Sequence, residues 1–152
     1  MFTVYDILDY ISKFLALMIV LSLHEFAHAF AADRLGDTTP RNQGRLSLNP
    51  IAHLDLMGFV LMMFAHIGWG KPVQVNPSNF NSNKSRGFCE TMISLAGPLM
   101  NFILAILSLI SATLLYKFGY SFVTTNVLGD LIFYLLRYFA MINISLGIFN
   151  LI

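Results

Sequence analysis

The sequence predicts an all-α integral membrane protein with three spanning helices plus one short re-entrant helical segment, and with short strand-like loops at the cytoplasmic face. Two observations lead to this fold class. The 152 residues are 57% hydrophobic and 11% charged, with a mean hydropathy of +0.69, which lies outside the range of soluble domains. Residues 92–116 also contain no Asp, Glu, Lys, Arg or His, and these 25 residues are enough to cross a bilayer.

The first spanning helix is expected from Tyr5 to Leu35, because Gly36 provides a helix stop signal. This stretch exceeds the roughly 20 residues that cross the hydrocarbon. Asp6 and Asp9 precede its apolar part and no small-residue cleavage site follows, so we do not expect a removable signal peptide.

The segment from Leu54 to Gly70 is expected to enter the membrane without crossing it. Its apolar part is only about 14 residues long, and Asp55 and His66 bound it. A re-entrant path also places six of the seven loop cations on one side, as the positive-inside rule requires. These six are Arg34, Arg41, Arg45, Lys71, Lys84 and Arg86, and Lys117 is the seventh. The N-terminus is then outside the cell.

The remaining two spanning helices follow the re-entrant segment. Residues 92–116 form the clearest one, and Ser108 and Ala112, four residues apart, allow another helix to pack closely against it. The last helix is expected from Asn126 to Ile152, with Asp130 and Arg137 as its charges. Its end returns to the cytoplasmic side.

Two connecting stretches, residues 37–50 and 71–77, are rich in turn-forming residues. Short alternating pieces such as Val73 and Val75 predict either edge strands that receive an extended peptide or plain surface loops. The sequence leaves both alternatives open.

Composition excludes several classes of protein. The net charge of +1, without a basic run, gives no electrostatic footprint for nucleic acid. Cys89 is the single cysteine, so the chain has neither an internal disulfide nor a cysteine-based zinc site. No long Gly/Ser-rich or Pro-rich linker interrupts the chain, and residues 1–152 are therefore expected to form a single membrane-embedded domain.

A metal-binding pattern lies near the end of the first predicted helix. His24 and His28 are four residues apart, so both imidazoles can reach one metal ion, and Glu25 then lies beside the bound water. The alternative is two unrelated helix histidines. An uncharged run, residues 14–23, directly precedes the motif, and ionisable groups at membrane depth are costly and usually functional. The pattern therefore indicates a zinc hydrolase acting within a membrane.

Further motifs occur in one order along the chain and cover nearly its whole length. They are HEFAH at residues 24–28, NPIAHLD at 49–55, GWGKPV at 68–73, AGPLMN at 96–101 and FNLI at 149–152. On these residues the chain resembles the site-2 protease family of intramembrane zinc metalloproteases, and in particular its small bacterial branch.

The resemblance implies a multi-pass protein of the bacterial cell membrane that uses Zn²⁺ to cleave transmembrane segments of other proteins, such as anti-sigma factors, or signal-peptide remnants. His24 and His28 are then the zinc ligands and Glu25 the general base. Asn150 matches a family asparagine near the zinc that positions substrate or steadies the oxyanion, although such an amide also bridges helices. Oligomeric state is not indicated.

The family pattern continues after FNLI to an Asp-Gly pair whose aspartate is the third zinc ligand. Because residues 1–152 do not include this pair, we expect the chain to be an incomplete copy. A second interpretation is therefore a non-catalytic scaffold or inactive fragment that binds transmembrane segments without cleavage. A transporter is less well supported, since no inverted repeat is present.

Other polar residues have structural alternatives. His53 and Asp55 are the in-chain candidates for a substitute third ligand, but their position at a turn also suits a helix cap. Asn101 and Asn143 serve either the site or helix packing. Gly97 and Pro98 are expected to loosen the long helix and permit close packing instead of performing chemistry.

Overall fold

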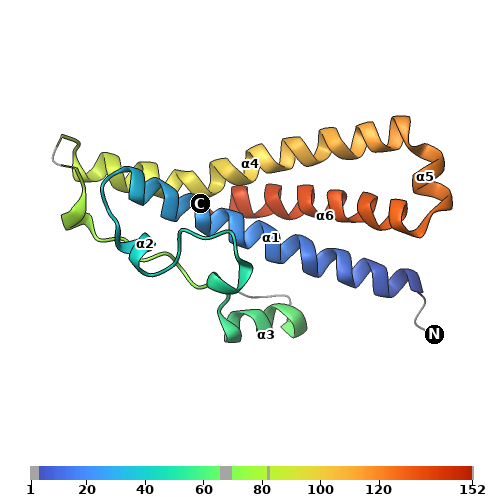
Figure 1. Ribbon diagram of the computed structural model, residues 1–152, viewed down its shortest axis with the longest axis horizontal. Helices are drawn as coiled ribbons and strands as arrows, with labels where there is room; N and C mark the ends of the chain where they lie inside the picture. Colours follow the sequence, from blue (N-terminus) through green and yellow to red (C-terminus); the bar gives the residue numbers. More distant parts are fainter. Residues whose placement is uncertain (1–3, 66–69, 82, 152) are drawn as a thin grey trace. The chain divides into compact units, whose positions relative to one another are not determined.

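The computed structural model describes residues 4–65, 70–81 and 83–151, which form helices joined by loops (Figure 1). Three helices are long and the others short. In chain order the elements are α1 (Val4–Arg34), α2 (Thr39–Asn42), the 3₁₀ turn η1 (Pro50–Ala52), α3 (Leu56–Ala65), the 3₁₀ turn η2 (Pro77–Asn79), α4 (Arg86–Phe118), α5 (Tyr120–Thr125) and α6 (Val127–Phe149).

The three long helices agree with the predicted spanning segments. By length and composition, Asp6–Arg34, Arg86–Phe118 and Val127–Phe149 are each able to cross a membrane, with mean hydropathies of 1.7, 2.1 and 1.7. The second of these begins before residue 92, because polar residues at its start continue the helix outside the apolar stretch. The short helix α5 was not predicted.

The ends of the helices follow from local hydrogen bonds. Gly36 has a φ of 105°, and the Asp37 N–H bonds to the Ala32 carbonyl at 3.0 Å, which is the Schellman arrangement that ends α1. At the start of α6, the Asn126 side chain accepts a hydrogen bond of 2.9 Å from the Leu128 N–H. The predicted stop at Gly36 is confirmed.

Helix α3 is too short to cross a bilayer. Its ten residues extend about 15 Å, half of the hydrocarbon thickness. The Asp55 carboxylate caps its start by accepting a bond of 2.8 Å from the Gly58 N–H. Leu56 and Met57 are exposed. The expected boundary of this segment at His66, and the first two residues of the GWGKPV motif, lie outside the described residues.

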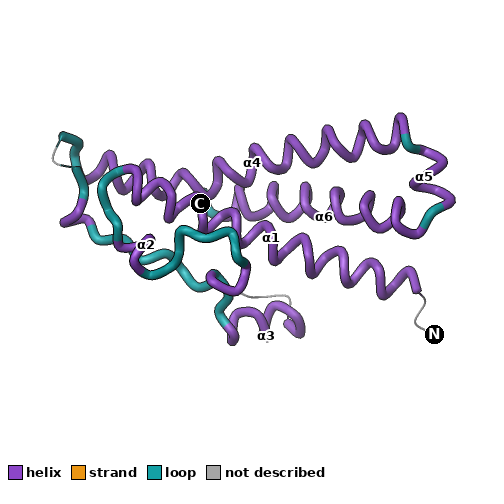
Figure 2. The backbone as a smooth tube through the Cα atoms, in the orientation of Figure 1, coloured by secondary structure: helices purple, strands orange, loops and turns teal. Residues whose placement is uncertain are grey.

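The expected edge strands are absent from the described part of the chain (Figure 2). Only an isolated bridge pairs Leu54 with Gly70. Residues 71–76 cannot extend it, because Pro72 lacks an N–H and two other N–H groups bond to carboxylates instead of to a strand. The Val73 N–H donates to Glu25 and the Asn76 N–H donates to Asp37 at 2.6 Å. The surface-loop alternative is therefore correct here.

The chain divides into two compact units, one formed by Met1–Val20 with Asn101–Ile152 and the other by Leu21–Met100. Small and polar side chains fill the interior of the first unit, as expected for helices that pack closely in a membrane. These buried residues include Ser12, Ala16, Asn101, Ala105, Ser108, Ala112, Ala140 and Asn143. Within this unit the Tyr138 hydroxyl donates a hydrogen bond to Asp9.

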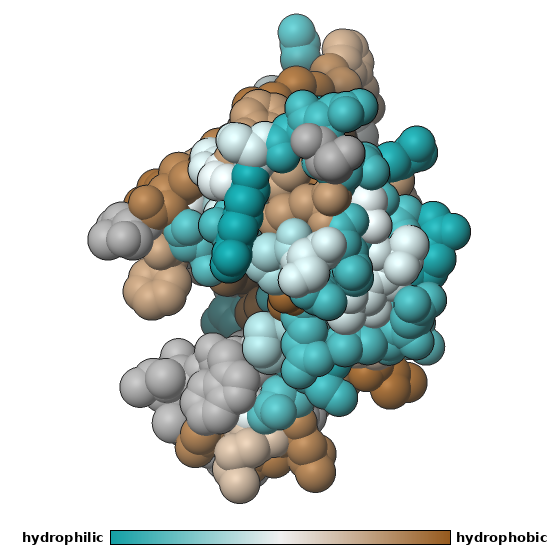
Figure 3. Space-filling view, turned by 90° about the vertical axis from the view of Figure 1, so that its left-hand side faces the viewer, coloured by the Kyte–Doolittle hydropathy of each residue, from teal (hydrophilic) through white to brown (hydrophobic). Residues whose placement is uncertain are grey.

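The second unit carries most of the polar loops. Its hydrophobic cluster contains Ala32, Leu35, Cys89 and Ile93. The buried Asp37 carboxylate accepts bonds from the Thr39 N–H and the Asn79 amide, both at 3.0 Å, and from Asn76, so it joins two loops. Figure 3 views the molecule from the loop side, where hydrophilic side chains gather.

Candidate metal centre

The two histidines of the HEFAH motif converge on one point. Their Nε2 atoms are 3.0 Å apart, and their ring centroids are 4.6 Å apart at an interplanar angle of 81°. His24 is 4% exposed, and His28 is half-buried. This follows from the helix itself, since positions i and i+4 lie one above the other on one face of α1.

The orientation of His28 is set by helix α4. Its Nδ1 lies 2.7 Å from the backbone carbonyl of Ile93. A carbonyl can only accept, so Nδ1 carries the proton and Nε2 presents a lone pair. Metal-binding histidines are held in this way by an acceptor on the second ring nitrogen.

Gly97 lets the α4 backbone approach the histidine pair. A Cβ at this position would lie 2.4 Å from His28 Nε2 and 2.5 Å from His24 Cε1, closer than real Cβ contacts. Gly97 and Pro98 are both buried. The expected role of Gly97 in close packing is confirmed, and what it packs against is the candidate ligand pair.

Glu25 lies beside the chain segment that begins at Gly70. The Val73 N–H donates a hydrogen bond to its carboxylate, and a Cβ on Gly70 would be 3.9 Å from Glu25 Oε1. The Lys71 N–H bonds to the His53 carbonyl at 2.8 Å, which fixes the start of this segment. Glu25 is therefore half-buried and held by a backbone donor.

Arg45 was predicted as a loop cation on the membrane's positive side, but it is only 5% exposed. Its guanidinium donates to the Ala52 carbonyl and, at 3.5 Å, to the Lys71 carbonyl. Its charge acts on both Glu25 and His53. The sequence shows only a cation in a turn-rich loop and does not predict this burial. The contacts join Arg45 to carbonyls that are 7 and 26 positions away along the chain.

His53 is a buried side chain beside this arginine. Its Nε2 donates to the Ser47 carbonyl at 2.7 Å, and in the described part of the chain no partner reaches its Nδ1. Burial lowers the pKa of His53 from its ordinary value, the bond to Ser47 opposes this, and the Arg45 charge adds to the lowering. His53 therefore braces the loop through its bond to Ser47.

The histidine pair fits half of a zinc site. Two nitrogens on one tetrahedral zinc ion, each at about 2.0–2.1 Å from it, are roughly 3.3 Å apart, close to the 3.0 Å between the Nε2 atoms of His24 and His28. Among the described residues, no group of three or more His, Cys, Asp and Glu side chains is placed to hold a metal ion. Of the two alternatives left open for Asp55, the helix cap is the one observed, at the start of α3.

The model of Peptidase family M50 matches residues 12–152. The chain belongs to peptidase family M50. It is 35% identical over 141 residues to a Bacillus subtilis protein named "Putative zinc metalloprotease YwhC", with 91% of this chain and 61% of that protein covered. Proteins named "Putative zinc metalloprotease Rip2" from Mycolicibacterium smegmatis and Mycobacterium tuberculosis are 34% and 36% identical over 109 and 103 residues.

The alignments to the two Rip2 proteins cover 67% and 65% of this chain and 41% and 39% of theirs. This M50 chain thus spans about three fifths of the length of the first relative and about two fifths of the others. No solved structure matches it significantly. The predicted family is confirmed, and the relatives are bacterial.

The three asparagines considered for the site of this M50 chain, Asn101, Asn143 and Asn150, belong to the first compact unit. Asn150 ends α6 and donates from its amide to the Leu146 carbonyl at 2.8 Å. Asn143 is buried and donates to Phe139 of its own helix at 2.8 Å, and Asn101 is also buried. The catalytic role of Asn150 stays a prediction.

Proposed function

We propose that the protein is an intramembrane zinc metalloendopeptidase that hydrolyses peptide bonds in transmembrane segments of other membrane proteins. One observation carries this proposal. His24 and His28 converge beside Glu25 on a helix that is able to span a membrane, in a chain of family M50. An ionisable group that is left unpaired in the bilayer has a high free-energy cost. The grouping of these three side chains therefore supports a functional site.

His24 and His28 would hold the zinc through Nε2. When bound, zinc supplies Lewis acidity toward the scissile carbonyl and lowers the pKa of a coordinated water. The Ile93 carbonyl keeps the His28 proton on Nδ1, so Nε2 stays available for coordination. Gly97 leaves the space that the two rings need.

Glu25 accepts a proton from the attacking water and passes it to the leaving amine. The Val73 N–H holds one of its carboxylate oxygens, and the nearby guanidinium of Arg45 secures the loop that carries this donor. The Asn150 amide is the proposed donor to the developing oxyanion, an assignment that rests on the family resemblance alone.

The substrate has to unwind before it can be cleaved, because a transmembrane helix keeps every peptide carbonyl in its own hydrogen bonds. Anti-sigma factors and signal-peptide remnants are the substrate classes that the resemblance implies. The bacterial plasma membrane is the expected location, with the N-terminus outside and α3 entering from the cytoplasmic side.

The test is Glu25→Gln in the full gene product, reconstituted with a transmembrane reporter substrate. We expect bound zinc to stay at one ion per chain and cleavage to fall below detection, whereas His24→Ala and His28→Ala lose zinc as well. Glu90→Gln, which removes an exposed carboxylate paired with Arg86 at 2.8 Å, is the matched control and retains cleavage. Normal cleavage by Glu25→Gln would exclude the assigned base.

A non-catalytic scaffold is the second candidate, and one observation favours it: the described residues provide two metal-binding side chains instead of three. A scaffold would bind the reporter segment without zinc and without cutting it. Metal analysis of the purified gene product, together with chelation by EDTA, separates the two candidates.

A further inference from the structure

Residues 46–60, which include η1 and the start of α3, turn large apolar side chains outward. The exposed fractions run from 41% for Val60 to 79% for Leu56, and the other members of this set are Leu48, Ile51 and Met57. His53, in the middle of the same stretch, is buried. A loop that faces water has the reverse arrangement, with its polar side chains outside.

This stretch lies at the level of the metal-binding motif. A Cβ added to Gly70 would lie 3.3 Å from the His53 carbonyl oxygen and 3.9 Å from Glu25 Oε1, so His53 and Glu25 flank the same backbone position. Leu54 also pairs with Gly70. Glu25 comes more than two turns before α1 ends at Arg34, on a helix that is able to span a membrane. The stretch therefore lies at membrane depth, beside the candidate metal centre.

The non-helical backbone of residues 47–54 has the hydrogen-bond partners that this depth requires. Irregular backbone is tolerated in a membrane only where its polar groups are satisfied within the protein. Three side chains supply partners here: the Asn49 amide oxygen accepts from the Ile51 N–H at 3.1 Å, His53 Nε2 donates to the Ser47 carbonyl at 2.7 Å, and Arg45 donates to the Ala52 carbonyl. The backbone can therefore lie against lipid without losing hydrogen bonds to water.

The segments on either side of this stretch have the character of an aqueous surface. The exposed residues just before it are Arg41, Asn42, Gln43 and Gly44, and those after Gly70 include Lys71, Gln74 and Ser78. Exposed side chains thus change from polar to apolar between Gly44 and Leu48. A change of this kind within a few residues is typical of a chain that passes from water into lipid.

We propose that residues 48–60 form a lipid-facing wall of the second compact unit, in contact with the acyl chains of the bilayer. Acyl chains are the occupant that fits, because the described exposed side chains of the wall are apolar except for Asn49 and none is charged. Asp55, its one charged residue, turns its carboxylate to the Gly58 N–H at 2.8 Å. The chain then enters the bilayer earlier than Leu54, where the sequence predicts entry.

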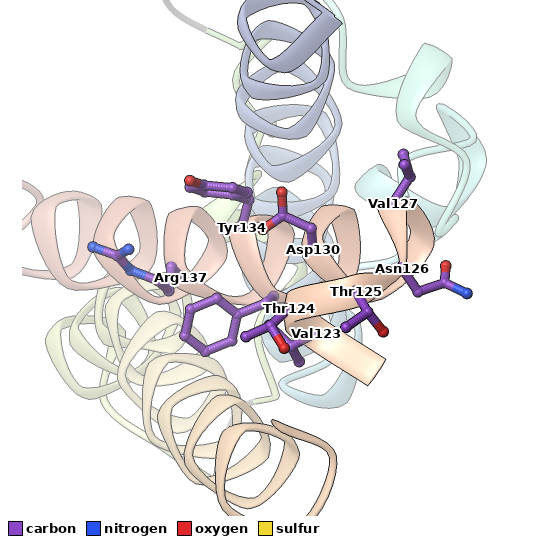
Figure 4. Close-up of a pocket in the computed structure, with 9 residues that line it drawn as sticks. Val123, Thr124, Thr125, Asn126, Val127, Asp130, Tyr134 and Arg137 are labelled. Atoms are coloured by element: carbon purple, nitrogen blue, oxygen red, sulfur yellow. The ribbon is translucent and has the colours of Figure 1, made fainter. Parts of the chain in front are cut away.

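The pocket between α5 and α6 does not account for the wall. It has a volume of about 300 Å³ and is lined by residues of the first compact unit, whereas the wall belongs to the second. In Figure 4 the Arg137 guanidinium extends along α6 away from Asp130, so these two charges do not face one small ligand.

The test is spin labelling of the full gene product in phospholipid bilayers, with a nitroxide attached at Ile51→Cys or Met57→Cys. We expect the nitroxide at both positions to collide more often with O₂, which partitions into lipid, than with a water-soluble nickel chelate. Asn42→Cys, at an exposed position of α2, is the matched control and should give the opposite order. The wild-type protein, in which Cys89 is buried, gives the labelling background.

More frequent nickel collisions at both wall positions would overturn the proposal, because the wall would then face water. Protection of both positions from both reagents would overturn it as well, since protein would then cover the wall. Neither measurement depends on zinc or on cleavage, so this placement is tested separately from the proposed activity.

A charge placed on the wall provides a second measurement. Ile51→Lys should lower the midpoint of thermal unfolding in bilayers, because an ammonium group in lipid is costly. Asn42→Lys, on the aqueous side of the boundary, should leave the midpoint unchanged. Equal midpoints for the two lysine variants would contradict the lipid contact.

Discussion

The Nδ1 of His28 donates a hydrogen bond of 2.7 Å to the backbone carbonyl of Ile93. This one contact links the metal-binding motif on α1 to the backbone of α4, and it selects the histidine tautomer that can bind a metal. Four residues further along α4, Gly97 lies against the same ring. The metal-binding geometry thus depends on a contact between two helices, made by residues that are 65 positions apart in the sequence.

Gly97→Ala is predicted to weaken zinc binding. The new Cβ would lie 2.4 Å from His28 Nε2 and would displace the ring. Zinc affinity, measured by competition with a chelating dye, should fall by about 10–100-fold, as when support of a ligand is lost. Gly87→Ala on the same helix is the control, because nothing lies within 4 Å of its added Cβ. Equal zinc affinity of the two variants would show that Gly97 does not limit the site.

Arg45→Met is predicted to destabilise the loop over Glu25. The Ala52 and Lys71 carbonyls lose a charged donor while buried, which costs about 1.5–3 kcal/mol for a hydrogen bond of this kind. Thermal unfolding in detergent should show a clear decrease in midpoint. Arg86→Met, at an exposed i,i+4 pair, should cost about 0.3–0.5 kcal/mol. A similar small change for both arginines contradicts the buried role of Arg45.

Asp37 is predicted to make stability depend on acid pH. Burial raises the pKa of Asp37, but hydrogen bonds from Thr39, Asn79 and Asn76 outweigh it, and the pKa lies below the ordinary 3.8. A folded-state pKa below the unfolded one means that the stabilisation is present above pH 3.8 and is lost as pH falls through the folded value. Unfolding midpoints measured from pH 6 to about 3 should decrease, and Asp37→Asn should flatten this decrease.

The control for Asp37 is Glu90→Gln, which removes a carboxylate that is exposed on α4. Its pH profile should keep the acid decrease of the wild type. If Asp37→Asn and Glu90→Gln give the same profile, then other groups cause the acid sensitivity.

Val73→Pro is predicted to reduce cleavage while zinc stays bound. Proline has no N–H, so Glu25 loses the backbone donor that orients its carboxylate. The loss of a positioning hydrogen bond should lower kcat by about tenfold or more. Gln74→Pro stiffens the same loop and keeps the Val73 donor, so it serves as the control. Equal kcat for the two proline variants would mean that the donor is dispensable.

The three long helices could be predicted because each leaves a local signal. Apolar stretches of about 20 residues with few charges have few alternatives in a bilayer, and Gly36 marks the end of α1 by a backbone conformation that other residues rarely adopt. The His24 and His28 pair could be predicted from the sequence equally well, since its geometry depends only on the helix repeat. These features need no knowledge of tertiary contacts.

The loop around Glu25 could not be predicted in the same way. Val73 and Val75 alternate as in a strand, yet the N–H groups of Val73 and Asn76 are taken by the carboxylates of Glu25 and Asp37, both far away in the sequence. Arg45 is buried for a similar reason, because two carbonyls from separate segments receive its guanidinium. Such long-range pairing is invisible to periodicity and turn propensity.

The tautomer of His28 also depends on how closely α4 lies against α1. If α4 were to move away from α1, the Ile93 carbonyl would no longer retain the hydrogen on Nδ1, and the ring could carry it on the other nitrogen instead. A ring protonated on Nε2 cannot coordinate a cation through that nitrogen. Separation of these two helices and release of the ion would then occur as a single event.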